Sequence, residues 1–124
     1  MKKVPRISES EWQVMRILWA RNPLTANEVV KGLSKTKWSP RTIKTLLNRL
    51  VKKKAISYEK KGREYDYYPL IGETESVRAE SKSFLKRVYG GAMQPMLAAF
   101  LEQEKLSQEE VKELKHILEK KGRG

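Results

Sequence analysis

One helix-start motif occurs three times in the chain and sets where helices can begin. Ser8, Thr25 and Ser107 are each followed three residues later by a glutamate and are flanked by a pair of apolar residues. In such a capping box the hydroxyl oxygen accepts the amide of the third helical residue, and the glutamate accepts the amide of the capping residue. Three helices are therefore predicted to begin directly after these positions.

A fourth helix is predicted to begin after Ser39, with a different first turn. Ser39 is a suitable N-cap and Pro40 suits the first helical position, but Thr42 stands where the other three helices have glutamate. An acid at this position stabilises an isolated helix through the macrodipole. It would also repel a phosphate docked at that helix end. The missing acid is explained equally well by anion binding and by drift at a single residue.

The helix after Ser39 combines an apolar face with a face that carries no acid. Its apolar residues follow the spacing of a buried helix face, and the opposite face holds basic side chains and small hydrogen-bonding ones. A helix in the DNA major groove needs such a face, because Arg and Lys bind guanine or phosphate, Asn binds adenine, and Thr contacts phosphate or the thymine methyl. The predicted groove contacts are Arg41, Lys44, Thr45 and Asn48, and the predicted phosphate contacts are Thr25, Asn27, Ser39, Thr42 and Arg49.

A β-hairpin is predicted after this helix. Residues 56–59 and 65–68 are rich in strand-forming side chains, and Gly62 between them can take the positive φ of a tight turn. Lys60, Lys61 and Arg63 would be exposed together at the tip, where they could touch the phosphate backbone or reach a minor groove. Three helices followed by a hairpin is the order of a winged helix-turn-helix domain, predicted here for residues 1–71.

Residues 72–124 predict three short amphipathic helices with no sheet to cover them. A self-paired dimerisation unit would bury their apolar faces, and a cyclic dimer would suit an inverted-repeat DNA site. The predicted fold is thus mainly α with a small β-hairpin, comprising a winged-helix domain and a helical dimerisation region. The predicted dimer contacts are Phe84, Val88, Met93, Met96, Leu97, Phe100, Leu101, Val111, Leu114 and Leu118.

The positive charge lies almost entirely in the first part of the chain. Residues 1–70 hold 17 Lys and Arg against 6 Asp and Glu, whereas residues 71–124 hold 10 against 9. Such a localised field favours a polyanion. A membrane surface is disfavoured because the basic helix lacks bulky aromatic residues, and RNA because no aromatic residue is expected on the basic face for base stacking. A sequence-indifferent architectural DNA-binding protein remains as the alternative to a repressor.

No catalytic or metal site is predicted. The chain has no Cys, one His (His116) and one Asp (Asp66), and it has no glycine-rich phosphate-binding motif. It is therefore expected not to be an enzyme and to need no cofactor. No apolar run approaches the roughly 20 residues of a membrane span, and the basic start lacks the apolar stretch of a signal peptide. A cytoplasmic location is expected.

Several stretches resemble the penicillinase-repressor family of bacterial regulators. They are residues 7–15, 38–46 (WSPRTIKTL), 67–70, 84–91 (FLKRVYGG) and 106–110. The resemblance implies a homodimeric winged-helix repressor of β-lactamase or similar resistance genes, bound to double-stranded DNA at short inverted repeats. It also implies a membrane sensor-protease pathway, with cleavage in the dimerisation region between Ala99 and Phe100. The best-known members have Asn before that Phe, and the copper-responsive relatives carry a Cys-rich tail that is missing here.

Overall fold

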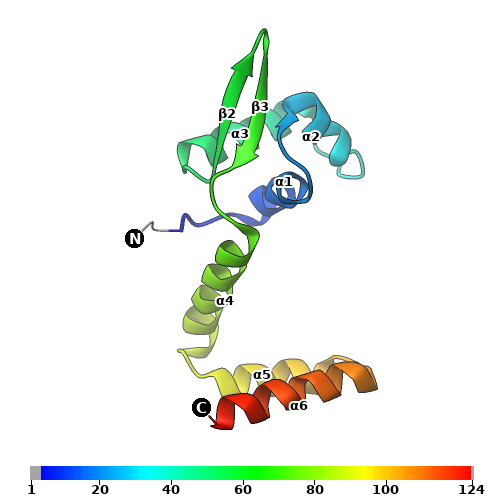
Figure 1. The fold of residues 1–124 in the computed structure, drawn as a ribbon, viewed down its shortest axis with the longest axis vertical. Coiled ribbons are helices and arrows are strands. Elements are labelled where there is room, and N and C mark those ends of the chain that lie inside the picture. The colour runs from blue at the N-terminus through cyan, green and yellow to red at the C-terminus, as the bar shows by residue number, and fades with distance from the viewer. Residues whose placement is uncertain (1–3, 124) are drawn as a thin grey trace. The chain divides into compact units, whose positions relative to one another are not determined.

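The computed structural model describes residues 4–123 and confirms the predicted fold class, a mainly helical chain with a small β-structure (Figure 1). The chain divides into two compact units, and the boundary between Ser81 and Lys82 lies inside a helix. The elements in chain order are α1 (Glu9–Ala20), β1 (Leu24–Thr25), α2 (Ala26–Gly32), α3 (Pro40–Lys52), β2 (Ile56–Lys61), β3 (Glu64–Pro69), α4 (Glu73–Tyr89), α5 (Met93–Gln103) and α6 (Gln108–Arg123).

All four predicted helix starts are confirmed. Ser8 and Thr25 form complete capping boxes with the glutamates three residues on, and Ser107 makes the same reciprocal pair of bonds with Glu110. The backbone amides of Thr25 and Ser107 favour charged carboxylates and so lower the pKa values of Glu28 and Glu110. At α3 the Ser39 hydroxyl oxygen accepts the Thr42 amide at 3.2 Å, with Pro40 at the first position.

The core of the first unit lies between α1, α2, α3 and the strands. Ile43, Leu46, Leu47 and Leu50 form the buried face of α3 at the predicted spacing. Val14, Met15 and Leu18 face them from α1 and are fully buried. The Trp19 indole nitrogen donates to the carbonyl oxygen of Ile71 at 3.0 Å, which fastens α1 to the segment after β3. Packing against this core fixes how α3 presents its opposite face.

The sheet has three antiparallel strands in the order β1-β3-β2, one more than the predicted hairpin. Two residues of β1, Leu24 and Thr25, pair with Tyr67 and Asp66 of β3. The β2–β3 hairpin, called the wing from here on, is also longer than predicted. Cross-strand pairing continues to Lys61 and Glu64, so the expected five-residue connection is wrong. Only Gly62 (φ +64°) and Arg63 form the turn.

A buried ion pair joins α1 to the end of α3. The Glu11 side chain is 1% exposed and pairs with Lys53 Nζ, whose side chain is 36% exposed and also donates to the Arg6 carbonyl oxygen at 2.9 Å. Burial alone would raise the pKa of Glu11, but hydrogen bonds from Lys53 and Ser8 outweigh it and lower the pKa below its ordinary value. The stabilisation is therefore present above the ordinary glutamate pKa and is lost as pH falls through the lower, folded-state value.

Lys53→Met is expected to lower the free energy of unfolding by about 2–3 kcal/mol at pH 7, because it leaves a buried carboxylate without its cation. Adding Glu11→Gln should restore most of this loss, since glutamine can still accept the Ser8 amide. Without Lys53 the Glu11 pKa should be higher than in the wild type, so the carboxylate takes up a proton more readily and the loss of stability shrinks toward pH 4. Urea unfolding at both pH values measures this. If Lys53→Met lost the same free energy of unfolding at pH 7 and at pH 4, and Glu11→Gln did not restore it, the role given to the ion pair would be contradicted.

The second unit leaves its apolar side chains unburied. No described side chain from residue 82 to residue 123 is fully buried, and Val88, Met93, Phe100, Ile117 and Leu118 are about half exposed or more. The rings of Phe84 and Phe100 stack with centroids 6.2 Å apart, which joins α4 to α5. α4 ends at Tyr89, directly before Gly90 and Gly91, which both have positive φ. Among residues 4–123, no helix is long and apolar enough to cross a bilayer.

Candidate nucleic-acid interface

The outer face of α3 is exposed and carries no acid. Its exposed side chains are Arg41, Thr42, Lys44, Thr45, Asn48, Arg49 and Lys52, all of them predicted to lie opposite the buried face or to flank it. The absence of a carboxylate along this helix leaves every charge on it positive. Such a surface can approach phosphates without repulsion while its polar side chains reach base edges.

A cleft of about 310 Å³ brings α3 together with α2 and the wing. Five predicted DNA contacts meet in its walls, although they are spread over almost 40 residues of sequence. The lining residues are Thr25, Ala26, Asn27, Lys44, Asn48, Arg63, Glu64, Tyr65 and Tyr67. The five predicted contacts thus bring two cations, two amide side chains and a hydroxyl to one hollow, against a single carboxylate, that of Glu64. Such a set suits the polar and anionic surface of a DNA groove.

Internal hydrogen bonds restrict several of the predicted contacts. Thr45 Oγ1 donates to the Arg41 carbonyl oxygen at 3.0 Å, so its hydroxyl hydrogen is in use while its methyl group stays exposed. The Ser39 and Thr42 hydroxyls lie 3.1 Å apart and bond to each other. Thr25 Oγ1 accepts the Glu28 amide as a helix cap and can still donate its hydrogen. The side chains with the freest donors on this surface are therefore the amides and cations.

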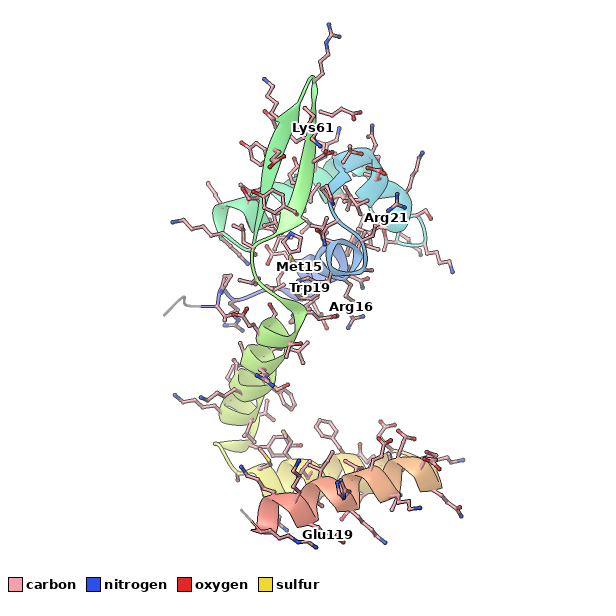
Figure 2. All side chains as sticks on the ribbon, in the orientation of Figure 1. Met15, Arg16, Trp19, Arg21, Lys61 and Glu119 are labelled. Atoms are coloured by element: carbon pink, nitrogen blue, oxygen red, sulfur yellow. The ribbon has the colours of Figure 1, made fainter. Side chains whose placement is uncertain are left out.

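The remaining predicted DNA contacts do not line the cleft. Ser39, Arg41, Thr42 and Arg49 lie exposed at the start and on the flanks of α3. Lys60 and Lys61 are exposed in β2, and Lys61, near the tip of the wing in Figure 2, places its Nζ 3.4 Å from Asp66 Oδ2. All three cations predicted for the wing, Lys60, Lys61 and Arg63, are thus exposed, and Lys61 is paired with an acid.

Tyr65 is the residue that sequence reasoning missed. It lines the cleft and stacks on Tyr58, with ring centroids 4.4 Å apart and planes at 25°. The basic face of α3 itself carries no aromatic residue, but the cleft beside it does. Alternation along β3 was the available signal, because Tyr65 and the core residue Tyr67 are two apart and must share a face.

The predicted dimer contacts gather in the second unit without burial. Six are exposed, namely Val88, Met93, Phe100, Leu101, Val111 and Leu118, and four are half-buried, namely Phe84, Met96, Leu97 and Leu114. Of the predicted cleavage pair within α5, Ala99 is half-buried and Phe100 is 47% exposed. Among residues 4–123 no three His, Asp or Glu side chains gather in a metal-binding arrangement.

Comparison with known proteins connects this architecture to a family. The penicillinase repressor family matches residues 7–120. The chain is 48% identical to the penicillinase repressor of Bacillus licheniformis over 120 residues, 96% of this chain and 94% of that protein. It is 40% identical to the methicillin resistance regulatory protein MecI of Staphylococcus aureus strain N315, covering 96% of this chain and 98% of that protein.

A solved structure extends the likeness to three dimensions. It is the solution structure of the monomeric form of Bacillus licheniformis BlaI in complex with the blaP half-operator, 47% identical, with a TM-score of 0.53 over 60% of this chain and 93% of that chain. The agreement in sequence runs nearly end to end, and the agreement in structure covers the winged-helix part. The chain belongs to the penicillinase repressor family.

Proposed function

We propose that this protein is a sequence-specific transcriptional repressor that binds double-stranded operator DNA. The observation that carries the proposal is the cleft, where Lys44 and Asn48 of α3 meet Arg63 of the wing and Asn27 of α2. Side chains able to read base edges and cations able to hold phosphates are thereby presented on one surface. The BlaI complex supports it, since a protein 47% identical in sequence binds a half-operator.

We infer that the repressor acts as a homodimer on an inverted repeat. The second unit supports this, because α5 and α6 have no buried residue although they carry apolar residues such as Phe100 and Leu118 along their length. Exposed apolar surface of this kind marks an interaction site. Two DNA-binding units related by a twofold axis would each take one half-site. Genes of β-lactam resistance are the proposed targets, as the names of the relatives suggest.

Relief of repression by proteolysis belongs to the same proposal. The Ala99–Phe100 bond lies inside α5, and a protease needs this stretch extended. Every residue of α5 is at least partly exposed, so few contacts oppose its local unfolding in a monomer. Cutting there would divide the apolar surface of the second unit and weaken the dimer. The sensor-protease pathway would act on this bond.

Footprinting on the DNA upstream of the chain's own gene tests the proposal. A repressor should protect a discrete inverted repeat whose half-sites lie about one or more helical turns, roughly 10 base pairs each, apart. Protection that spreads evenly over any duplex, with no discrete segment at any protein concentration, would overturn the proposal. That result would favour a sequence-indifferent architectural protein, which needs only the basic field.

A further inference from the structure

The two faces of the wing differ in chemistry. Strand pairing places Tyr58 opposite Tyr67 and Lys60 opposite Tyr65, and directly paired residues share a face of a sheet. The face shared by these four residues carries three aromatic rings, one cation and no acid. It is the face of Tyr67, which is buried in the core, so it continues from the core toward the cleft.

The reverse face is acidic. Strand alternation places Glu59, Lys61, Glu64 and Asp66 on it, which is three carboxylates against one cation. Lys61 Nζ lies 3.4 Å from Asp66 Oδ2. A phosphate approaching Lys61 would therefore meet a surface of net negative charge, whereas a phosphate approaching Lys60 would not.

Stacking holds the aromatic face in place. The three ring centroids form a triangle, with Tyr65 4.4 Å from Tyr58 and 6.4 Å from Tyr67, and Tyr58 5.9 Å from Tyr67. Tyr67 is 7% exposed and anchors the cluster, and Tyr58 and Tyr65 are about 40% exposed. A ring already held by a stacked neighbour and an edge contact loses little side-chain entropy when its hydroxyl takes a partner, which favours a binding role for Tyr65.

We propose that the wing contacts DNA through its aromatic face, with Tyr65 donating a hydrogen bond to a backbone phosphate, Tyr58 positioning that ring, and Lys60 supplying the charge. A phosphate is the expected partner because Tyr65 shares the cleft with the cations Lys44 and Arg63. Glu64 also lines the cleft, and the two cations outweigh it. The inference rests on the proposed function and assigns Lys61 no direct contact.

The adjacent lysines provide a matched pair of variants. Lys60→Ala is expected to weaken binding to upstream DNA and to a shuffled duplex alike, and to reduce the salt slope by about 1, because one phosphate contact is lost. Lys61→Ala removes the same charge from the next residue and should change affinity less than about 2-fold. Titrations by fluorescence anisotropy at three salt concentrations measure both. Equal losses for the two variants would overturn the assignment of faces.

The salt dependence of DNA binding distinguishes the contribution of the tyrosines from that of the charged residues. Tyr65→Phe should weaken binding to both duplexes by about 2- to 10-fold, as one hydrogen bond is lost, with the salt slope unchanged because no charge is removed. Tyr58→Leu should give a comparable loss, and Tyr58→Phe, which keeps the stacked ring, should bind normally. Wild-type affinity for Tyr65→Phe would overturn the tyrosine contact.

Two outcomes separate this inference from the proposed function. If the wild-type protein prefers the upstream DNA but these variants contradict the expected pattern, only the assignment within the wing fails. If the wild-type protein shows no preference for upstream over shuffled DNA, the proposed function fails. Matching thermal unfolding of all variants confirms that the wing stays folded.

Discussion

Replacing Lys44 and Asn48 together by alanine is expected to weaken binding to the operator by about 100- to 1,000-fold, since each well-placed base contact contributes about 1–3 kcal/mol of discrimination. Both side chains line the cleft from successive turns of α3, beside Arg63 of the wing. Binding to shuffled DNA should fall far less, because most phosphate contacts remain. Anisotropy titrations with both duplexes measure the two losses.

A matched control comes from α1. Gln13 and Arg16 are an exposed amide and an exposed cation one helical turn apart, and neither lines the cleft. Gln13→Ala/Arg16→Ala removes comparable groups and should leave the ratio of specific to non-specific affinity unchanged. If the α3 variant lost affinity for both duplexes in the same proportion, Lys44 and Asn48 would not be reading bases.

Leu97→Asp with Phe100→Asp is expected to convert the protein to a monomer and to lower its affinity for the full inverted repeat by about 100-fold or more. Linked half-sites bind more tightly than single ones because the second contact is intramolecular, which is worth about 10²–10⁴ in affinity. Leu97 is half-buried and Phe100 is 47% exposed. The Phe100 ring stacks on the Phe84 ring. Sedimentation velocity measures the oligomeric state.

Two exposed polar residues of α5 supply the control for this variant. Gln94 and Gln103 are exposed, and Gln94→Asp/Gln103→Asp adds the same two charges to the same helix. This control should remain a dimer. Half-site binding by the Leu97/Phe100 variant should match that of the wild type, which shows that the DNA-binding unit is folded. Sedimentation as a dimer would place the interface elsewhere.

The local parts of the fold were predictable from sequence because their causes are local. Each helix start depends on a hydroxyl and a residue three positions away, and Ser8, Thr25 and Ser107 therefore identified their helices correctly. The buried and exposed faces of α3 follow from helical periodicity over 13 residues. The identity of the base-reading candidates comes from the same pattern.

The parts that were missed depend on distant pairing. β1 has two residues, too few to show alternation, and exists because Leu24 meets Tyr67 of β3. The Glu11–Lys53 pair joins residues 42 positions apart. Pairing between β2 and β3 extends the strands to Lys61 and Glu64, and Lys60 and Lys61 therefore face opposite ways. None of these three features can be derived from local composition, because each depends on contact between segments that are separate in the sequence.

The central claim is that the chain reads a particular DNA sequence. Titration onto the DNA upstream of its own gene and onto a shuffled copy, at several salt concentrations, tests this most directly. The predicted result is an affinity ratio of about 10³ or more that persists at physiological salt, as is typical of specific DNA-binding proteins. Equal binding to both duplexes, falling steeply with salt, would contradict the claim and leave only a basic surface that binds any DNA.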